Sequence, residues 1–184
     1  MQEIKVFLFA WRINGWLSRY NEIMILDLPY ILETRRNHAL EHATLHMLSR
    51  THKINMAGHS NPTGFFIFGE LLTEDLRAAL NEAYSRLRSG ESGLAIHPGC
   101  GTNLVATAFL PATMAWMPMQ GARSIRWRLL LIPIALVFGV FGFFLSKPLG
   151  TWLQRYITTE ANLGNMQIVD VTLVRKGVHR IITK

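Results

Sequence analysis

The feature that most constrains this chain is an uninterrupted apolar run from Leu129 to Leu145, which contains no charged side chain. A helix needs about 20 mainly apolar residues to cross the roughly 30 Å of hydrocarbon in a bilayer. With its flanking residues the run meets that need, and we predict a membrane-spanning helix over about residues 129–146. The chain is therefore expected to be an integral membrane protein.

A second apolar stretch, Leu104 to Met119, also carries no charge but includes Pro111 and Pro118. It is short for a span, yet with the polar residues at its ends it could cross. The polar link Gly121 to Arg128 separates the two stretches, so we predict a tight transmembrane hairpin with helices at about 103–119 and 129–146. Tryptophans stand near the expected ends of the spans, where indole rings favour the interface: Trp116, Trp127 and Trp152.

Composition agrees with a chain that is partly in water and partly in lipid. Hydrophobic residues make up 49% of the chain, and they concentrate after Thr102. The formal net charge of +7 suits anionic lipid head groups or nucleic acid. Because the Lys and Arg residues are scattered or flank apolar segments, the expected partner is the bilayer, with no nucleic acid. The single cysteine excludes an internal disulfide framework.

The first 31 residues are expected to form an N-terminal segment that lies in the membrane interface. Ile4 to Trp16 is apolar and aromatic, but Arg12 and Asn14 interrupt it, and no small-residue cleavage site follows. It is too short to span. An amphipathic interfacial helix and an ordinary core helix fit this pattern about equally.

The rest of the chain indicates a small α+β domain. Expected elements are a helix from Leu32 to Arg50, a turn from Gly58 to Gly64, a strand at Phe65–Phe68, a helix capped by Thr73, a strand at Leu94–Ile96, and strands at Met166–Val174 and Val178–Ile182. A hairpin leaves the residues before and after it on one side of the membrane. We therefore predict an α/β part at 32–101, an inserted transmembrane hairpin at 102–147, and a C-terminal β-hairpin at 148–184 that packs on the 32–101 part.

The predicted first helix carries the pattern His38-Ala-Leu-Glu41-His42. At 3.6 residues per turn, His38 and His42 lie on one face and can reach one metal ion, as in an H-x-x-E-H zinc helix. Glu41 is displaced by about 60° from His38 on this period. It could act as a general base toward water or as a ligand. The alternative is a helix with exposed histidines.

His97 and Cys100 supply a second half of the expected site, within His-Pro-Gly-Cys-Gly. A turn of this kind brings both side chains to one side of the backbone, and glycine allows close folding around an ion. Together with His38 and His42 they form a set typical of zinc, although another divalent transition metal would also fit. The alternative for the turn is a helix cap with a buried thiol. His46, one turn further along, is a supporting residue or an alternative ligand.

These segments resemble known families. The runs Asn37-His-Ala-Leu-Glu-His-Ala-Thr, Asn-Pro-Thr-Gly-Phe-Phe-Ile-Phe-Gly-Glu and His-Pro-Gly-Cys-Gly-Thr-Asn-Leu resemble a bacterial membrane-protein family known only as a domain of unknown function. The pairing of H-x-x-E-H with H-P-x-C-G-T is more distantly similar to YqhQ-like membrane proteins, which are labelled as predicted metal-dependent enzymes. That resemblance extends to the residues His38, Glu41, His42, His97, Cys100, Gly101 and Thr102.

Two functions follow as the main hypotheses, and a plain membrane adaptor without metal is a third possibility. In the first, the chain is a membrane-bound zinc hydrolase, with Glu41 as the catalytic base and an unknown substrate. In the second, it is a non-enzymatic accessory protein of a membrane complex, with a structural zinc held by four ligands. Transport by this chain alone is disfavoured because neither predicted span contains a charged residue. The resemblance to the bacterial family implies a bacterial inner or plasma membrane. The arginines of the link (Arg123, Arg126 and Arg128) favour a cytoplasmic link. The proposed thiolate prefers a reducing compartment, and no export signal is evident before the first span, so we expect the soluble domain to be cytoplasmic.

Overall fold

The computed structural model describes residues 25–184. The expected interfacial segment at 1–31 lies almost wholly outside the described residues. The elements in chain order are helix α2 (Pro29–Thr51), strands β1 (Ala57–Asn61) and β2 (Gly64–Phe68), helix α3 (Thr73–Arg88), the 3-10 turn η1 (Ser92–Ala95), helix α4 (Gly101–Trp116), the 3-10 turn η2 (Met117–Met119), helix α5 (Ile125–Leu153), the π-helical turn η3 (Gln154–Thr158), and strands β3 (Ile168–Arg175) and β4 (Val178–Thr183).

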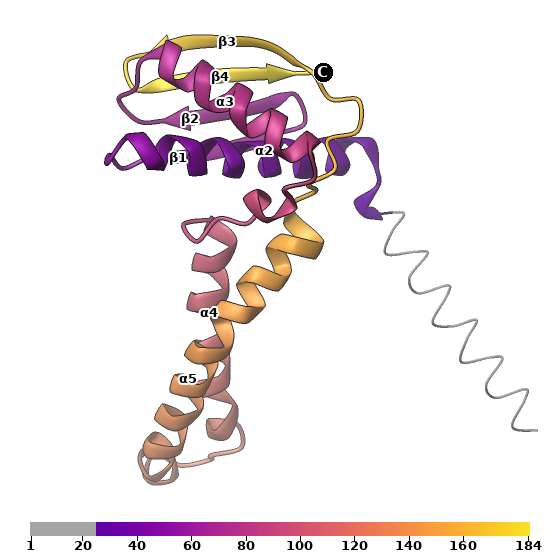
Figure 1. The fold of residues 1–184 in the computed structure, drawn as a ribbon. Coiled ribbons are helices and arrows are strands. Elements are labelled where there is room, and N and C mark those ends of the chain that lie inside the picture. Colours follow the sequence, from indigo (N-terminus) through magenta and orange to yellow (C-terminus); the bar gives the residue numbers. More distant parts are fainter. Residues whose placement is uncertain (1–24) are drawn as a thin grey trace, which may run out of the picture.

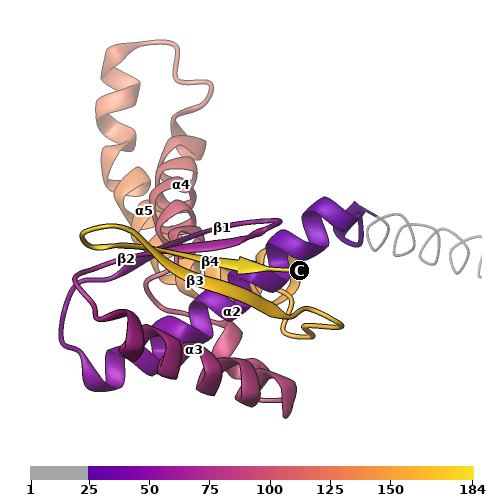
Figure 2. The same ribbon diagram turned by 90° about the horizontal axis from the view of Figure 1, so that it is seen from above.

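The four strands form one antiparallel sheet in the order β1-β2-β4-β3. The C-terminal hairpin β3–β4 is confirmed, and β4 pairs with β2, which stands more than 100 residues earlier in the chain. Helices α2 and α3 cover one face of the sheet (Figures 1 and 2). The α+β class expected from the sequence is therefore confirmed.

Alternating residues of the strands supply the sheet side of the core. Phe65 and Ile67 of β2 are fully buried, whereas Phe66 and Phe68 between and after them point to the other face. From the helices, Leu40 and Leu80 pack into the same cluster. Helix α2 contacts the sheet, α3 and η1, so it is buried on several sides. Such burial lets polar residues of α2 stand away from water in the site described below.

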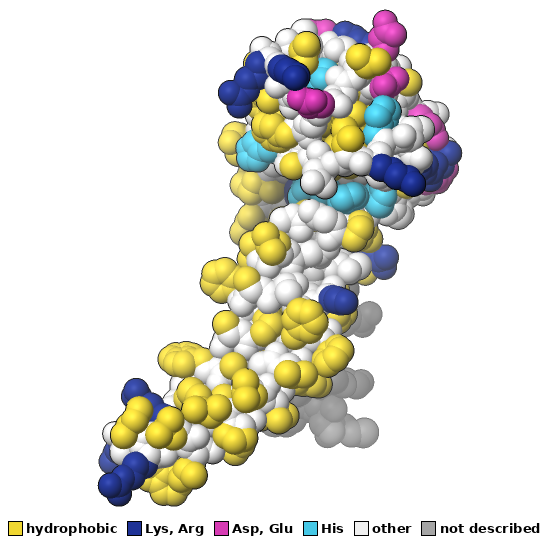
Figure 3. Space-filling model, turned by 90° about the vertical axis from the view of Figure 1, so that its left-hand side faces the viewer, with side chains coloured by type: hydrophobic (Ala, Val, Ile, Leu, Met, Phe, Trp, Pro, Cys, Tyr) yellow, Lys and Arg dark blue, Asp and Glu magenta, His cyan; other side chains and the backbone are white. Residues whose placement is uncertain are grey.

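Helices α4 and α5 lie side by side and project from the domain as a stalk (Figure 1). A Cβ atom at Gly142 would lie only 2.8 Å from the Cα atom of Pro111, so glycine permits the close approach of the two helices. Apolar side chains cover the visible face of the stalk, and Lys and Arg side chains gather at its tip (Figure 3).

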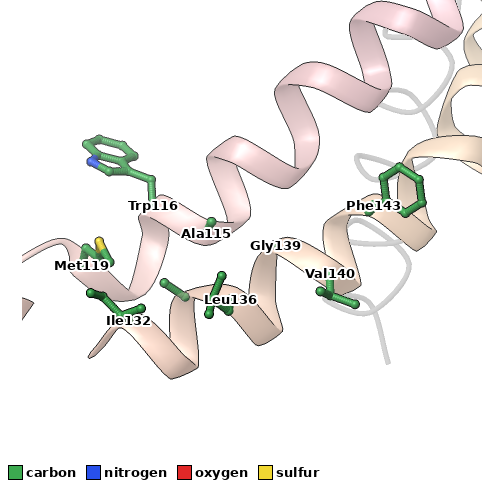
Figure 4. Close-up of a pocket in the computed structure, with 9 residues that line it drawn as sticks. Ala115, Trp116, Met119, Ile132, Leu136, Gly139, Val140 and Phe143 are labelled. Carbon is green, nitrogen blue, oxygen red and sulfur yellow. The ribbon is translucent and has the colours of Figure 1, made fainter. Parts of the chain in front are cut away.

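One helical segment of the described part, Ile125–Thr158, is long and apolar enough to cross a membrane by length and composition. Only 17% of its most apolar window is buried, unlike the core helix of a soluble protein. Helix α4 has 16 residues and is shorter than such a span. Of the two expected spans, the structure thus supports one. An apolar groove of about 540 Å³ runs between the helices near the tip, lined by residues such as Trp116, Leu136 and Phe143 (Figure 4).

Two expectations about local structure are wrong. Leu94–Ile96 is not a strand: residues 92–95 form the turn η1, and the carbonyls of Ala95 and Ile96 face histidines of α2 rather than a neighbouring strand. Gly58–Gly64 is not simply a turn, because β1 extends to Asn61 and only residues 62 and 63 form the loop. Pairing with β2 outweighs the turn preference of the Gly58-His-Ser-Asn segment.

Two helix ends also differ from expectation. Leu72, not Thr73, is the N-cap of α3, and the Thr73 hydroxyl instead lies 3.1 Å from Nε2 of His179. Helix α5 does not end near Pro148 but continues to Leu153 and then through η3. This extension carries the end of the stalk back to helix α2.

Candidate metal centre

Three of the residues expected to bind metal meet where the stalk joins the domain. His38 and His42 come from adjacent turns of α2, and Cys100 is the N-cap residue of α4. One potential ligand atom from each residue lies within 4.8 Å of the other two. Histidine side chains are visible in this junction in Figure 3. The structure thus brings together two imidazoles and one thiol from segments about 60 residues apart.

Backbone carbonyls orient both imidazoles. Nδ1 of His38 lies 2.9 Å from the carbonyl oxygen of Thr158, and Nδ1 of His42 lies 2.6 Å from that of Ala95. A carbonyl can only accept, so each neutral ring donates its Nδ1 proton and keeps a lone pair on Nε2. This is the tautomer that a metal-binding histidine uses when a neighbouring group holds its other nitrogen.

The carbonyl that orients His38 belongs to the π-helical turn η3. The Arg35 guanidinium donates hydrogen bonds to the carbonyl oxygens of Tyr156 and Thr159, at 3.2 Å each, and so fixes this turn against α2. Turns of this type are frequent at functional sites because they alter the direction of backbone groups. The end of the stalk is therefore part of the structure that holds His38 in place.

Cys100 is buried and lies at the beginning of α4, with its Sγ atom 3.5 Å from Nε2 of His38. Burial raises the pKa of this thiol, but hydrogen bonds with His42 and Thr102 outweigh burial, and the pKa falls below its usual value. A helix N-terminus acts in the same direction. The lowered pKa increases the share of thiolate, the form of cysteine that binds metal.

His97 does not join the group of three. Its ring centroid is 5.7 Å from that of His42 and 4.8 Å from that of His46. Nδ1 of His97 accepts a hydrogen bond from the backbone N–H of Gly99 at 3.1 Å, which leaves the proton of the neutral ring on Nε2. Burial, together with His46 and His42, lowers the pKa of His97 to about 4. The His97 ring is neutral, but its lone pair is on Nδ1 and is used by Gly99, whereas His38 and His42 keep a lone pair on Nε2.

The remaining histidines have separate surroundings. His46 lies beside His97, and its Nε2 atom is 2.8 Å from the carbonyl oxygen of Ile96. His52 pairs with Asp75, and His179 is buried in the sheet. His59 lines the cavity together with two of the three candidate ligands, His38 and Cys100.

Glu41 is buried beside the cluster, and its carboxylate accepts a hydrogen bond of 2.5 Å from the Ser60 hydroxyl. Burial raises the pKa of Glu41, while Ser60, His38 and His59 act in the opposite direction. Gly58 makes room for the carboxylate, since a Cβ atom there would overlap it. Sequence reasoning missed Gly58 and Ser60 because the segment that holds them resembles a turn.

A cavity of about 230 Å³ opens onto these groups. Its wall consists of Thr34, His38, Glu41, Gly58, His59, Ser60, Cys100, Gly101 and Thr102. Two imidazole nitrogens and a thiolate suit zinc, and three protein ligands leave a coordination position free for water or substrate. The residues present therefore fit a zinc ion, which His38, His42 and Cys100 would hold beside the cavity and Glu41.

Comparison with known proteins gives relatives whose names assign no activity. A family model described as a domain of unknown function, DUF6391, matches residues 33–171. An uncharacterized protein of Picosynechococcus sp. is 37% identical over 159 residues, which cover 78% of this chain and 74% of the relative. No solved structure matches. The residues matched by the family model contain α2 from its second turn onward, the candidate metal centre and the whole stalk.

Proposed function

This chain belongs to the DUF6391 family, and from that premise we propose that it is a membrane-bound, metal-dependent hydrolase with its site at the bilayer surface. The observation that carries the proposal is the shared cavity: it exposes two candidate ligands, His38 and Cys100, beside the buried carboxylate of Glu41. A structural site has no need of a carboxylate at an open face. The likeness of both motifs to YqhQ-like proteins supports the same interpretation.

His38, His42 and Cys100 would hold the metal. When bound there, zinc supplies Lewis acidity that polarises a substrate carbonyl and acidifies water. Glu41 takes a proton from water at its carboxylate and passes it to the leaving group. Ser60 holds the carboxylate in position through its hydrogen bond. The first turn of α4, with Gly101 and Thr102 in the cavity wall, favours negative charge that develops on the substrate.

The sheet supports a hairpin that crosses the membrane twice. Strand β4, which follows α5, pairs with β2, which precedes α4, so the residues before and after the stalk belong to one domain. If α5 crosses the bilayer, the chain must have crossed in the other direction before it. Helix α4 and η2 together cover Gly101–Met119 and span about 30 Å, close to the hydrocarbon thickness. The candidate metal centre then lies at the membrane surface.

Two features indicate on which side of the membrane the domain lies, and they disagree. A site that depends on a thiolate favours the reducing cytoplasm. The arginines in the link between α4 and α5 favour a cytoplasmic link instead. We propose a cytoplasmic domain, because the thiol belongs to the site itself, whereas arginines at a tip also bind head groups on either face.

His97 supports a second candidate function. Its ring stands 5.7 Å from that of His42, so a change of side-chain orientation that freed its Nε2 lone pair would give a fourth ligand. Four ligands would close the shell and make the zinc structural, as in an accessory protein of a membrane complex. Loss of zinc on replacement of His97 would favour this second function.

A hydrolysis assay tests the proposal. Full-length protein in lipid nanodiscs, loaded with zinc, is incubated with three classes of substrate: an unfolded polypeptide, a phospholipid and an acyl ester. We expect hydrolysis of one class by the wild type and a loss of about 10²–10⁴-fold for Glu41→Gln. Glu82→Gln, at an exposed position on α3, serves as the control and should keep full activity. Equal rates for the wild type and Glu41→Gln would refute the catalytic proposal.

A further inference from the structure

Strand β1 forms an edge of the sheet and at the same time part of the wall of the candidate site. Within residues 25–184 it pairs with β2 alone. Three of its five residues, Gly58, His59 and Ser60, line the cavity that holds Glu41 and Cys100. In an antiparallel pair, alternate residues of an edge strand direct their N–H and C=O groups away from the partner. In the described part of the chain no strand pairs with the outer edge of β1, so its outward-directed backbone donors and acceptors border the cavity.

We propose that the free edge of β1 binds an extended polypeptide as an additional strand and presents it to the site. This inference rests on the proposed hydrolase function and names its substrate class. Strand addition is a common mode of peptide recognition, in which main-chain hydrogen bonds supply affinity and pockets supply specificity. A lipid or a sugar does not offer alternating N–H and C=O groups at the spacing of a strand, so the edge favours a polypeptide.

The residues of β1 that face α2 are suited to this role. Gly58 has no side chain, and the Ser60 hydroxyl is held by Glu41, so no bulky group stands between the edge and the carboxylate. His59 is exposed and also lines the cavity. A polypeptide that lies along β1 must pass the mouth of the cavity, because β1 itself forms one of its walls.

The place of β1 in the fold indicates where such a polypeptide comes from. Of the four strands, β1 is the nearest to the base of the stalk, and β3 at the other edge is the farthest (Figure 1). With the stalk in a bilayer, a strand added to β1 lies at the membrane surface. The substrate is then a segment of a membrane-anchored polypeptide just outside the bilayer.

The chemistry balances as a hydrolysis. The oxygen of water forms a bond with the carbonyl carbon, and the C–N bond of the peptide breaks. The Glu41 carboxylate transfers one proton from that water to the leaving nitrogen, and the products are a carboxylic acid and an amine, which exchange the remaining proton to become a carboxylate and an ammonium. No oxidant or reductant is required.

Site-specific crosslinking tests the docking surface. A photoreactive p-benzoylphenylalanine is placed at Ala57 on β1 or at the exposed Val169 on β3, in full-length Glu41→Gln protein in nanodiscs. The probe is a synthetic peptide with a Leu/Ala transmembrane helix followed by a short unstructured segment. We expect capture from Ala57 and at least about tenfold less from Val169.

N-methylated probes identify the interaction. A peptide methylated at alternate amides keeps one free edge and should be captured from Ala57 like the unmodified probe. A peptide methylated at every amide of the segment cannot pair and should lose capture by about tenfold or more. Equal capture from both edges, or full capture of the completely methylated peptide, would overturn the docking proposal.

The same experiments separate this inference from the proposed function. Capture at Ala57 without hydrolysis of any substrate class would support the docking surface and count against the hydrolase. Hydrolysis of phospholipid or ester without capture at Ala57 would support the hydrolase and overturn the polypeptide proposal.

Discussion

The Nε2 atom of His38 lies 3.5 Å from the Sγ atom of Cys100, although the two residues stand 62 positions apart in the chain. The contact joins α2 of the domain to the first residue before α4 of the stalk. His38 is held from its other side by the end of the same stalk, through Thr158. The candidate centre is therefore built across the junction of the domain and the stalk, and its geometry depends on both.

Single replacements should separate the ligands from their neighbours. We expect the zinc content to fall from about one ion per chain to nearly none in His38→Ala, His42→Ala and Cys100→Ser. The reason is that each replacement leaves only two protein ligands for the ion. His97→Ala should keep most of its zinc, since Nδ1 of His97 accepts from Gly99 and the ring lies outside the group of three. The measurement is elemental analysis of protein purified without chelator.

The control for this series is His52→Ala, which removes the histidine at the C-terminal end of α2 that pairs with Asp75 of α3. It should leave the zinc content unchanged. If His97→Ala loses zinc as completely as His42→Ala, the site has four ligands and the structural alternative is favoured.

Gly58→Ala should disturb the candidate site through one side chain. The new Cβ atom would overlap the Glu41 carboxylate, which must move and lose its hydrogen bond with Ser60. We expect a loss of about 1–3 kcal/mol in the free energy of unfolding, together with loss of any activity that needs Glu41. Zinc content should remain. Thermal unfolding in detergent and metal analysis measure the two effects.

Gly93→Ala is the matched control, because no atom lies within 4 Å of a Cβ at that position and its backbone is unstrained. Its stability should stay within about 0.5 kcal/mol of the wild type. An unchanged unfolding midpoint and activity for Gly58→Ala would show that Glu41 does not need its observed position.

Most of the domain could be predicted from the sequence because local patterns and packing agree there. The helix that carries His38 and His42, the strand Phe65–Phe68 and the C-terminal strands all have clear periodicity. The strand β1 was missed, because its sequence Ala-Gly-His-Ser-Asn favours a turn and only pairing with β2 makes it a strand. Long-range pairing of this kind leaves no local signal.

The candidate site was likewise predictable where the signal is local and not where it depends on distant backbone atoms. His38 and His42 follow from helical spacing, and Cys100 follows from its place in a Gly/Pro turn. The carbonyls of Ala95 and Thr158 that orient the imidazoles could not be predicted, since backbone atoms carry no residue-specific signal. Motif spacing also placed His97 with the ligands. Its actual orientation depends on the backbone N–H of Gly99, which a pattern of residue types does not encode.

Stability should fall on acidification, partly through His179. This residue is fully buried in the sheet, and burial lowers its pKa below the ordinary value of 6.5. The unfolded chain therefore binds a proton more readily than the folded chain. The contribution to stability is complete above pH 6.5 and is lost progressively as the pH falls below that value.

His179→Gln removes the titrating group and keeps a polar side chain next to Thr73. We expect a smaller loss of stability between pH 7 and pH 5 for this variant than for the wild type, measured by denaturant unfolding in detergent at a series of pH values. Gly93→Ala, which removes no titratable group and meets no atom within 4 Å, is the control and should keep the wild-type slope. Identical slopes for the wild type and His179→Gln would contradict the prediction.

The orientation of the stalk can be measured with two serine-to-cysteine variants at exposed positions. Ser124 lies in the link at the tip, and Ser89 lies in the domain after α3. If both helices cross the bilayer and the domain is cytoplasmic, a membrane-impermeant maleimide should label Ser124→Cys in intact cells, and Ser89→Cys only after permeabilisation. The wild type is the control, because its single thiol at Cys100 is buried. The reverse pattern would place the domain outside, in agreement with the arginines of the link. Labelling of both positions from one side would show that the stalk does not cross, and the candidate centre would then need another explanation for its place at the base of an apolar hairpin.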